Sequence, residues 1–192
     1  MSSSEKDIWL DNCRILKSEH CDARTEPYLD RSNIDLLVIH NISLPPAKNE
    51  ADFNNEHVEA FFTGKLDKHV HPYFEQIAQL RVSAHLYIKR TGEIVQFVPL
   101  NKRAWHAGVS EFEGRDKCND FSIGIEMQGT DDLPFTDEQY KSLTEVTRAI
   151  MTIFPKIDKT KIVGHQEIAP TRKTDPGPCF DWNRYKTTLT NM

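Results

Sequence analysis

Two histidines and an aspartate in this sequence have the residue types and the settings of a metal-binding group. His40 directly follows a short apolar segment, and His165 follows a second short apolar segment and a glycine. Asp175 lies beyond them in residues 172–178, a segment that is rich in proline and glycine and is stiffened by its prolines. Two imidazoles and one carboxylate are a common ligand set of catalytic zinc, because they leave the fourth tetrahedral position to water. From residue types and spacing alone, two structural histidines and a capping aspartate are an equally good interpretation.

Short apolar segments predict the strands that would hold these residues. The hydrophobic pattern indicates strands over residues 34–39, 81–88, 93–98, 121–127 and 161–163, and the second and third of these form a hairpin. The run over 34–39 is nearly continuously apolar, which is typical of a strand buried on both faces. It ends at His40, and the last strand ends just before His165. We expect both side chains to project from rigid strand ends into a cleft.

The clearest helix is predicted over residues 137–154, where apolar residues recur at helical spacing. Thr136 and Gln139 form a capping box at its start. Residues 55–80 are predicted to be largely helical, with breaks at a glycine and a proline, and Asp181 is predicted to cap a terminal helix. Strands that alternate with helices predict an α/β fold, a single domain in which helices flank a mixed central β-sheet.

The composition argues against several classes of protein. The net charge of -5 provides no broad basic footprint for nucleic acid. No apolar run approaches the roughly 20 residues of a membrane helix, and the first residues contain no apolar core of signal-peptide length. We therefore expect a cytoplasmic protein that binds neither membranes nor nucleic acid, and a monomer. Its four cysteines form no CxxC pair and are expected to be reduced.

Several long stretches resemble the AmpD-type N-acetylmuramoyl-L-alanine amidases, within the wider amidase and peptidoglycan-recognition-protein fold. These stretches are LLVIHNISLPP (36–46), FFTG (61–64), LRVSAHLYIKRTGEIVQFVP (80–99), KRAWHAGVS (102–110), CNDFSIGIEMQGT (118–130) and GHQEIAPTRKTDPGPCFDW (164–182). They follow one another in the family's order over about residues 31–186. We therefore divide the chain into a loosely organised N-terminal lead-in, residues 1–30, and a zinc amidase domain, residues 31–192.

The resemblance implies one zinc ion on His40, His165 and Asp175, with Glu126 and Lys173 as catalytic partners. Bound zinc lowers the pKa of its water to about 7 and polarises a carbonyl. Glu126, in the alternating segment 121–127, would then act as general base and later as general acid. The ammonium of Lys173 would stabilise the oxyanion of the tetrahedral intermediate. Without the resemblance, Glu126 and Lys173 would be interpreted as ordinary solvated side chains.

Five further residues are candidates for binding the substrate. Asn41 adjoins a zinc ligand, and Trp105 and His106 lie in a glycine-containing segment that could line a groove, where His106 would be a hydrogen-bond partner rather than a ligand. Arg81 and Lys117 are the candidates for holding the free carboxylates of a stem peptide. The family often has arginine where Lys117 stands, and lysine keeps the charge but lacks the bidentate fork.

The implied reaction is hydrolysis of the amide bond between the lactyl group of 1,6-anhydro-N-acetylmuramic acid and L-alanine of the stem peptide, in cell-wall recycling. The implied substrates are soluble anhydromuramyl-peptides. A non-catalytic peptidoglycan-binding protein is the main alternative, although such relatives typically lack a complete metal set. A cysteine hydrolase that uses Cys118 is a third hypothesis, and only the composition supports it.

Overall fold

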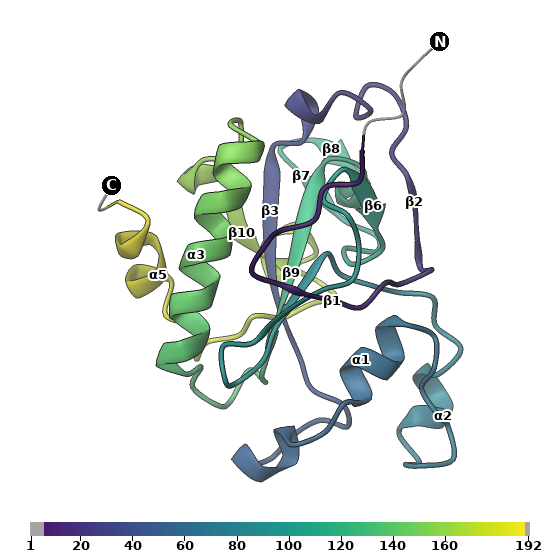
Figure 1. Ribbon diagram of the computed structural model, residues 1–192. Helices are drawn as coiled ribbons and strands as arrows, with labels where there is room; N and C mark the ends of the chain where they lie inside the picture. The colour runs from purple at the N-terminus through teal and green to yellow at the C-terminus, as the bar shows by residue number, and fades with distance from the viewer. Residues whose placement is uncertain (1–5, 191–192) are drawn as a thin grey trace.

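A mixed sheet of six strands runs through the centre of the protein (Figure 1), in a computed structural model that describes residues 6–190. The strands, in spatial order, are β1 (Arg14–Ile15), β5 (Ile94–Gln96), β4 (Leu86–Ile88), β9 (Ser122–Gln128), β3 (Leu36–Ile42) and β10 (Ile162–Gly164). Neighbouring strands are parallel except β4 and β5, which form the predicted antiparallel hairpin. This arrangement confirms the predicted α/β fold with a mixed central sheet.

The two central strands are buried along most of their length. In β3, residues 36–39 have no exposed surface, as their nearly continuous apolar sequence predicts. The apolar pattern predicted that this strand ends at His40, but its parallel pairing with β9 continues to Ile42 opposite Gln128. His40 therefore lies within β3 rather than beyond its end, and its pairing with Glu126 of β9 fixes its backbone.

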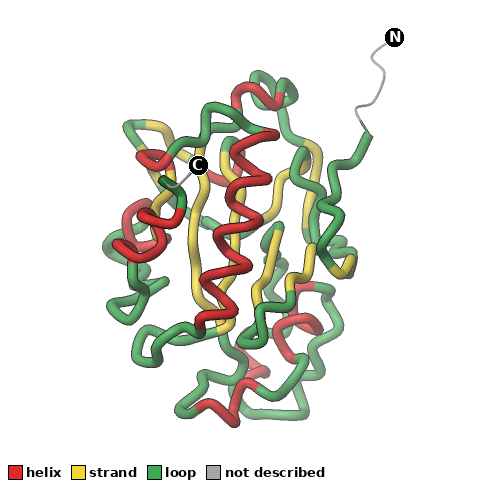
Figure 2. Tube along the Cα trace, turned by 60° about the vertical axis from the view of Figure 1, so that its left-hand side comes forward, coloured by secondary structure: helices red, strands yellow, loops and turns green. Residues whose placement is uncertain are grey.

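Helices α3 (Asp137–Ile153) and α5 (Trp182–Thr188) cover one face of the sheet (Figures 1 and 2). The predicted capping box of α3 is confirmed, because the Thr136 side chain accepts from the backbone N–H of Gln139 while the Gln139 side chain accepts from that of Thr136. Asp181 caps α5 by accepting from the backbone N–H of Arg184, also as predicted. The apolar stripe of α3 packs into the main core.

The segment between β3 and β4 has less helix than the sequence predicted. It contains only a 3-10 turn (Glu50–Phe53), α1 (His57–Phe62) and α2 (Phe74–Ile77), so the prediction of a largely helical 55–80 is wrong. Gly64, at a φ of 71°, reverses the chain just after α1. Aromatic side chains of this segment pack instead on β4 and β5, forming a second core cluster of Phe61, Phe62, Phe74, Tyr87 and Phe97.

Residues 6–30, ahead of the predicted domain boundary, contribute to the body of the protein. β1 adds an edge strand beside β5, and β2 (Cys21–Ala23) pairs antiparallel with β6 (Lys102–Ala104). A second small sheet joins β7 (Glu111–Phe112) to β8 (Arg115–Asp116). Further short elements are 3-10 turns at Arg31–Asn33, Cys118–Asp120 and Lys159–Lys161, and α4 (His165–Ile168). The boundary at residue 31 stays a prediction, but the described part of the lead-in, residues 6–30, is more ordered than the sequence suggested.

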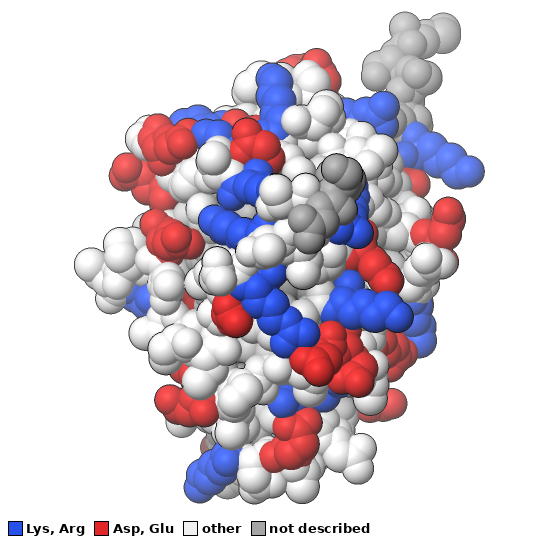
Figure 3. Space-filling view, turned by 90° about the vertical axis from the view of Figure 1, so that its left-hand side faces the viewer, with Lys and Arg blue, Asp and Glu red and all other residues white. Residues whose placement is uncertain are grey.

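Two surface properties bear on possible partners. Within residues 6–190, no helix combines the length and the apolar character that crossing a membrane requires. On the face that carries α3 and α5, basic and acidic side chains are interspersed (Figure 3). The four cysteines are free thiols.

Candidate metal centre

The register of the central strands brings the predicted site residues together. His40 on β3 lies opposite Glu126 on β9. On the other side of β3, Gly164 of β10 lies opposite Ile39, so that His165, the next residue, comes beside His40. Asp175 reaches the same place from the loop after α4, where its carbonyl accepts from the backbone N–H of Gln166 at 3.0 Å. Residues more than a hundred positions apart thus meet at the carboxyl ends of parallel strands.

The three predicted ligands form a tight, buried triangle. The Nδ1 atoms of His40 and His165 are 2.9 Å apart, and each lies 3.1 Å from Oδ2 of Asp175. The exposed fractions of His40, His165 and Asp175 are 1%, 2% and 9%. Tetrahedral zinc with bonds of about 2.0–2.2 Å separates its ligand atoms by roughly 3.3–3.6 Å, a few tenths of an ångström more than these distances. Two imidazole nitrogens and one carboxylate oxygen that converge on one buried point are a donor set that fits a zinc ion.

The outer ring nitrogens have partners that favour this role. Nε2 of His165 is 3.1 Å from the carbonyl oxygen of Ala107, so it carries the hydrogen and leaves a lone pair on Nδ1. Nε2 of His40 is 2.9 Å from Nδ1 of His106. Burial lowers the pKa of His40 to about 4 and lowers that of His106 well below its ordinary value. Both rings are therefore neutral, as a metal ligand and its hydrogen-bond partner require.

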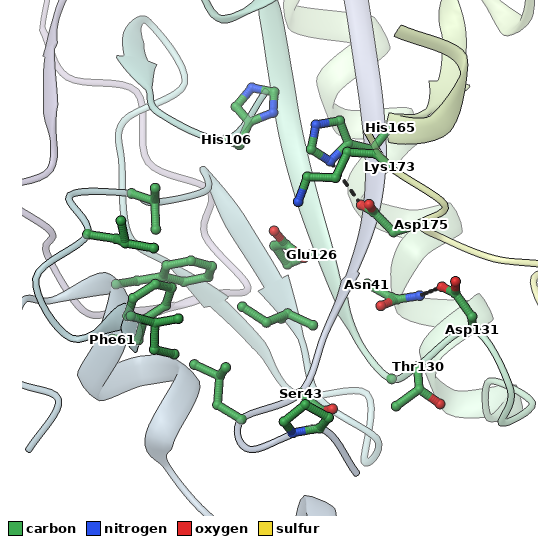
Figure 4. A pocket seen from close by; sticks show the side chains of 18 of the residues that line it. Asn41, Ser43, Phe61, His106, Glu126, Thr130, Asp131, His165, Lys173 and Asp175 are labelled. Atoms are coloured by element: carbon green, nitrogen blue, oxygen red, sulfur yellow. Dashed lines mark hydrogen bonds and ion pairs between the residues drawn. The ribbon is translucent and has the colours of Figure 1, made fainter. Parts of the chain in front are cut away.

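Glu126 and Lys173 lie beside the triangle. Oε2 of Glu126 is buried without a hydrogen-bond partner among the described residues, and the residue as a whole is 8% exposed. Burial raises the pKa of Glu126 well above its ordinary value, with a further rise from Asp175 and an opposing effect of Lys173. Lys173 extends from its loop toward Glu126 (Figure 4). For Asp175, burial alone would raise the pKa, but the adjoining ring nitrogens of His165 and His40 outweigh burial and lower it, so this carboxyl group stays ionised.

Glu126, His165, Lys173 and Asp175 line one side of an open cavity of about 520 Å³, while His40 is buried behind them. The opposite wall is mostly apolar and comes from the segment between β3 and β4, with Leu44, Phe61, Phe62, Tyr73, Ile77, Leu80 and Val82. Thr130 and Asp131 lie at one end (Figure 4). The cavity therefore presents a polar, chemically active side to an apolar side.

The five predicted substrate contacts are placed differently. Asn41, Trp105 and His106 line the cavity. The Asn41 amide donates to Asp131 at 2.8 Å and to the carbonyl of Pro176 at 3.0 Å, which leaves its own oxygen to face a substrate. Trp105 donates to Asp22 at 3.2 Å.

The two predicted cationic contacts do not line the cavity. The Arg81 guanidinium lies over the Trp105 ring, 5.3 Å from its centroid, and so sits beside the cavity wall. Lys117 is exposed, with a φ of 60°, at the start of the 3-10 turn Cys118–Asp120. The turn directs Lys117 into solvent, so the structure does not bring it to the site.

Comparisons with known proteins agree with this geometry. A family model described as N-acetylmuramoyl-L-alanine amidase matches residues 30–178. The 1,6-anhydro-N-acetylmuramyl-L-alanine amidase AmpD of Haemophilus influenzae is 56% identical over 176 residues, which cover 92% of this chain and 91% of that protein. The chain belongs to the N-acetylmuramoyl-L-alanine amidase family.

Solved structures of amidases share the fold. A crystal structure of AmpD as its selenomethionine derivative matches with a TM-score of 0.88 at 53% identity, covering 96% of this chain and 98% of that chain. The Escherichia coli amidase AmiD, solved with the substrate anhydro-N-acetylmuramic acid-L-Ala-D-γ-Glu-L-Lys, matches with a TM-score of 0.60 at 26% identity, covering 86% of this chain and 60% of that chain.

Sequence reasoning missed several residues that support the site of this amidase. Ser122 Oγ is 3.1 Å from Nε2 of His106, and the Asn119 side chain accepts from the backbone N–H groups of His106 and Ala107. A Cβ added at Gly124 would lie 2.5 Å from Cγ of His106, so only glycine leaves room for that ring. The glycine in the middle of an alternating strand was the one usable signal, because it indicates a close approach.

Proposed function

We propose that this protein is a zinc amidase that hydrolyses the bond between the lactyl group of 1,6-anhydro-N-acetylmuramic acid and L-alanine of a stem peptide. The observation that carries the proposal is the buried triangle of His40, His165 and Asp175 beside the unpaired carboxyl oxygen of Glu126. The AmpD relative at 56% identity, whose name states this activity, supports the choice of substrate.

His40, His165 and Asp175 would hold the ion through Nδ1, Nδ1 and Oδ2. When bound, zinc supplies Lewis-acid polarisation and a water of lowered pKa. The neutral ring nitrogens and the ionised carboxylate suit this role, because ligands must be deprotonated where they bind. A set of two neutral and one anionic ligand leaves a net positive charge for the chemistry.

Glu126 would move the protons of the reaction. Its carboxylate takes a proton from the attacking water and later delivers one to the nitrogen of the departing L-alanine. The raised pKa of Glu126 suits a group that must hold the proton between these two steps. Lys173 would donate to the oxygen that becomes negative when the carbonyl is attacked, a contribution of typically about 2.7–4 kcal/mol.

The cavity suits a substrate that combines a sugar with a peptide. Its apolar wall can cover carbon–hydrogen faces, while the Asn41 oxygen can accept from a peptide N–H. Arg81, beside Trp105, is the proposed contact for a stem carboxylate. Because Lys117 is directed into solvent at the turn Cys118–Asp120, we do not assign it this role. The E. coli amidase AmiD, which shares the fold, was solved with an anhydromuramyl-peptide substrate.

A chelator experiment tests the proposal. EDTA should abolish cleavage of an anhydromuramyl-tripeptide, and added zinc should restore it. Mass spectrometry of the products should show the free peptide that begins with L-alanine. A parallel reaction on intact peptidoglycan shows which of the two substrates the enzyme prefers. Full activity of the metal-free protein would overturn the zinc mechanism. Zinc binding and substrate binding without any cleavage would favour the non-catalytic alternative.

A further inference from the structure

A buried arginine lies in the segment that precedes the family match. Arg24 is 2% exposed, although it belongs to residues 1–30, which the sequence predicted to be a loosely organised lead-in. Its guanidinium donates to the backbone carbonyls of Asn119 at 3.0 Å, Asp120 at 2.8 Å and Ser122 at 2.8 Å. A fourth, longer bond of 3.4 Å reaches the carbonyl of Leu100. One side chain thus fixes the backbone of residues 119–122.

The segment 119–122 in turn holds the outer partners of both zinc-binding histidines. The Ser122 hydroxyl is 3.1 Å from Nε2 of His106, whose Nδ1 is 2.9 Å from Nε2 of His40. The Asn119 side chain accepts from the N–H groups of His106 and Ala107, at 3.1 and 2.8 Å. The carbonyl of that same Ala107 lies 3.1 Å from Nε2 of His165. Two hydrogen-bond chains therefore begin at one segment, and each ends on a different ligand.

The direction of the first chain follows from the proposed ligand atoms. If Nδ1 of His40 binds zinc, its Nε2 carries the hydrogen and donates to Nδ1 of His106. His106 must then carry its own hydrogen on Nε2 and donate it to Ser122. Ser122 is fully buried, so the position of its hydroxyl oxygen, the acceptor for His106, depends on the backbone of Ser122. That backbone carbonyl is one of those bound by Arg24.

A stabilising role alone is a weak explanation for this arginine. Its hydrogen-bond acceptors on residues 100 and 119–122 are backbone carbonyls, not carboxylates. Asp120 and Asp22 lie near enough to favour its charge, but no carboxylate among residues 6–190 accepts a hydrogen bond from it, and burying a cation in this way is costly. The planar fork can, however, bind several carbonyls at once and so fix their relative positions.

We propose that Arg24 is a positioning residue for the zinc site, acting through Ser122 and Asn119 on the outer hydrogen bonds of His40 and His165. The inference rests on the proposed zinc site. Arg24 lies before residues 30–178, the region that the family model matches. The proposal therefore gives the N-terminal segment a role in the metal site. Partners of metal-binding histidines typically change metal affinity by about 10–100-fold when they are removed.

Zinc affinity of the full chain, measured by competition with a chromophoric chelator, tests the proposal. Arg24→Met, Ser122→Ala and Asn119→Ala should each bind zinc about 10–100-fold more weakly than the wild type. The control is Arg90→Met, because Arg90 is another largely buried arginine that donates to a backbone carbonyl, that of Pro134, and to Glu50. Urea unfolding of each apoprotein gives the stability of every variant. Arg90→Met should lose stability and keep wild-type zinc affinity.

A folded Arg24→Met with wild-type zinc affinity would overturn the proposal. If Arg24→Met does not fold, Arg24→Lys takes its place, because lysine keeps the buried charge but lacks the planar fork of donors. Wild-type zinc affinity in Arg24→Lys would overturn the proposal equally. Wild-type affinity in both Ser122→Ala and Asn119→Ala would also overturn it. Nitrogen NMR of the zinc-loaded wild type should show His106 with its hydrogen on Nε2, and hydrogen on Nδ1 would contradict the chain.

These results separate this inference from the proposed function. If the wild type binds no zinc, or if His165→Ala binds it as well as the wild type, the proposed site itself fails. If the wild type binds one zinc ion and His165→Ala does not, the site stands, and the Arg24, Ser122 and Asn119 variants then decide the inference alone.

Discussion

The two sides of the cavity are built in different ways. The side that carries the candidate metal ligands stands on β3, β9 and β10, parallel strands that are buried along most of their length. The opposite wall stands on the segment between β3 and β4, where helices of 6 and 4 residues are joined by loops. The residues proposed for catalysis, which must be positioned to within a fraction of an ångström, thus lie on rigid elements. The apolar contacts come from an irregular segment.

This contrast has a kinetic consequence. A change on the strand side should lower kcat or remove zinc, because it displaces groups that act in the transition state. A change on the loop side should raise KM and leave kcat nearly unchanged, because it removes binding that substrate and transition state share. Substitutions on each side can therefore sharpen the comparison or break it.

The largest effect is expected for Glu126→Ala. Loss of the general base should lower kcat by about 10²–10⁴-fold, while zinc content stays at one per chain. Steady-state kinetics on an anhydromuramyl-peptide and elemental analysis of the same preparation measure both quantities. Glu111→Ala, at an exposed position, is the control. If zinc is lost together with activity, Glu126 is a ligand and not the base.

Lys173→Met should lower kcat by roughly 10²–10³-fold, the usual cost of one donor to an oxyanion. KM should change little, because the negative charge develops only in the transition state. Lys141→Met, on the solvent side of α3, controls for loss of a surface charge. A raised KM with unchanged kcat would instead make Lys173 a contact for the ground state of the substrate.

Gly124→Ala should weaken zinc binding and also destabilise the fold. The added Cβ would lie 2.5 Å from Cγ of His106, so the ring must move away from His40. Overpacking of this kind costs typically about 1–3 kcal/mol. Urea unfolding and chelator competition measure the two effects. Ile150→Val, a core change on α3, should lower stability by about 0.5–1.5 kcal/mol and leave zinc affinity unchanged; a Gly124→Ala variant that behaves the same way would refute the link.

The smallest effect is expected on the apolar wall. Leu80 lines the cavity but is 49% exposed, so Leu80→Ser should raise KM by less than about tenfold, or 1.4 kcal/mol, at constant kcat. Val70→Ser, at a position 59% exposed and away from the cavity lining, should leave both parameters unchanged. A drop in kcat for Leu80→Ser would mean that this wall also shapes the reaction, and the contrast between the two sides would fail.

The sequence was informative where local pattern and tertiary structure agree. The apolar run before His40 and the capping box at Thr136 have local causes, so β3 and α3 were predictable to within a few residues. The segment 55–80 was not, because its aromatic side chains are held by packing on β4 and β5 rather than by helical hydrogen bonds.

The same distinction applies to the site. The residue types of His40, His165 and Asp175 were visible in the sequence, and the family resemblance selected them. Their convergence depends on strand register, which a single sequence does not reveal. The role of Arg24 could not be predicted from the sequence for a stronger reason. Its hydrogen bonds go to backbone carbonyl groups, which every residue has, so no pattern of side chains indicates them.

X-ray absorption spectroscopy at the zinc edge of the loaded wild-type protein tests the central claim most directly. We predict only nitrogen and oxygen neighbours, at about 2.0–2.2 Å, with the outer scattering of two imidazoles. A sulfur neighbour at about 2.3 Å, or a number of imidazoles other than two, would contradict a site made of His40, His165 and Asp175.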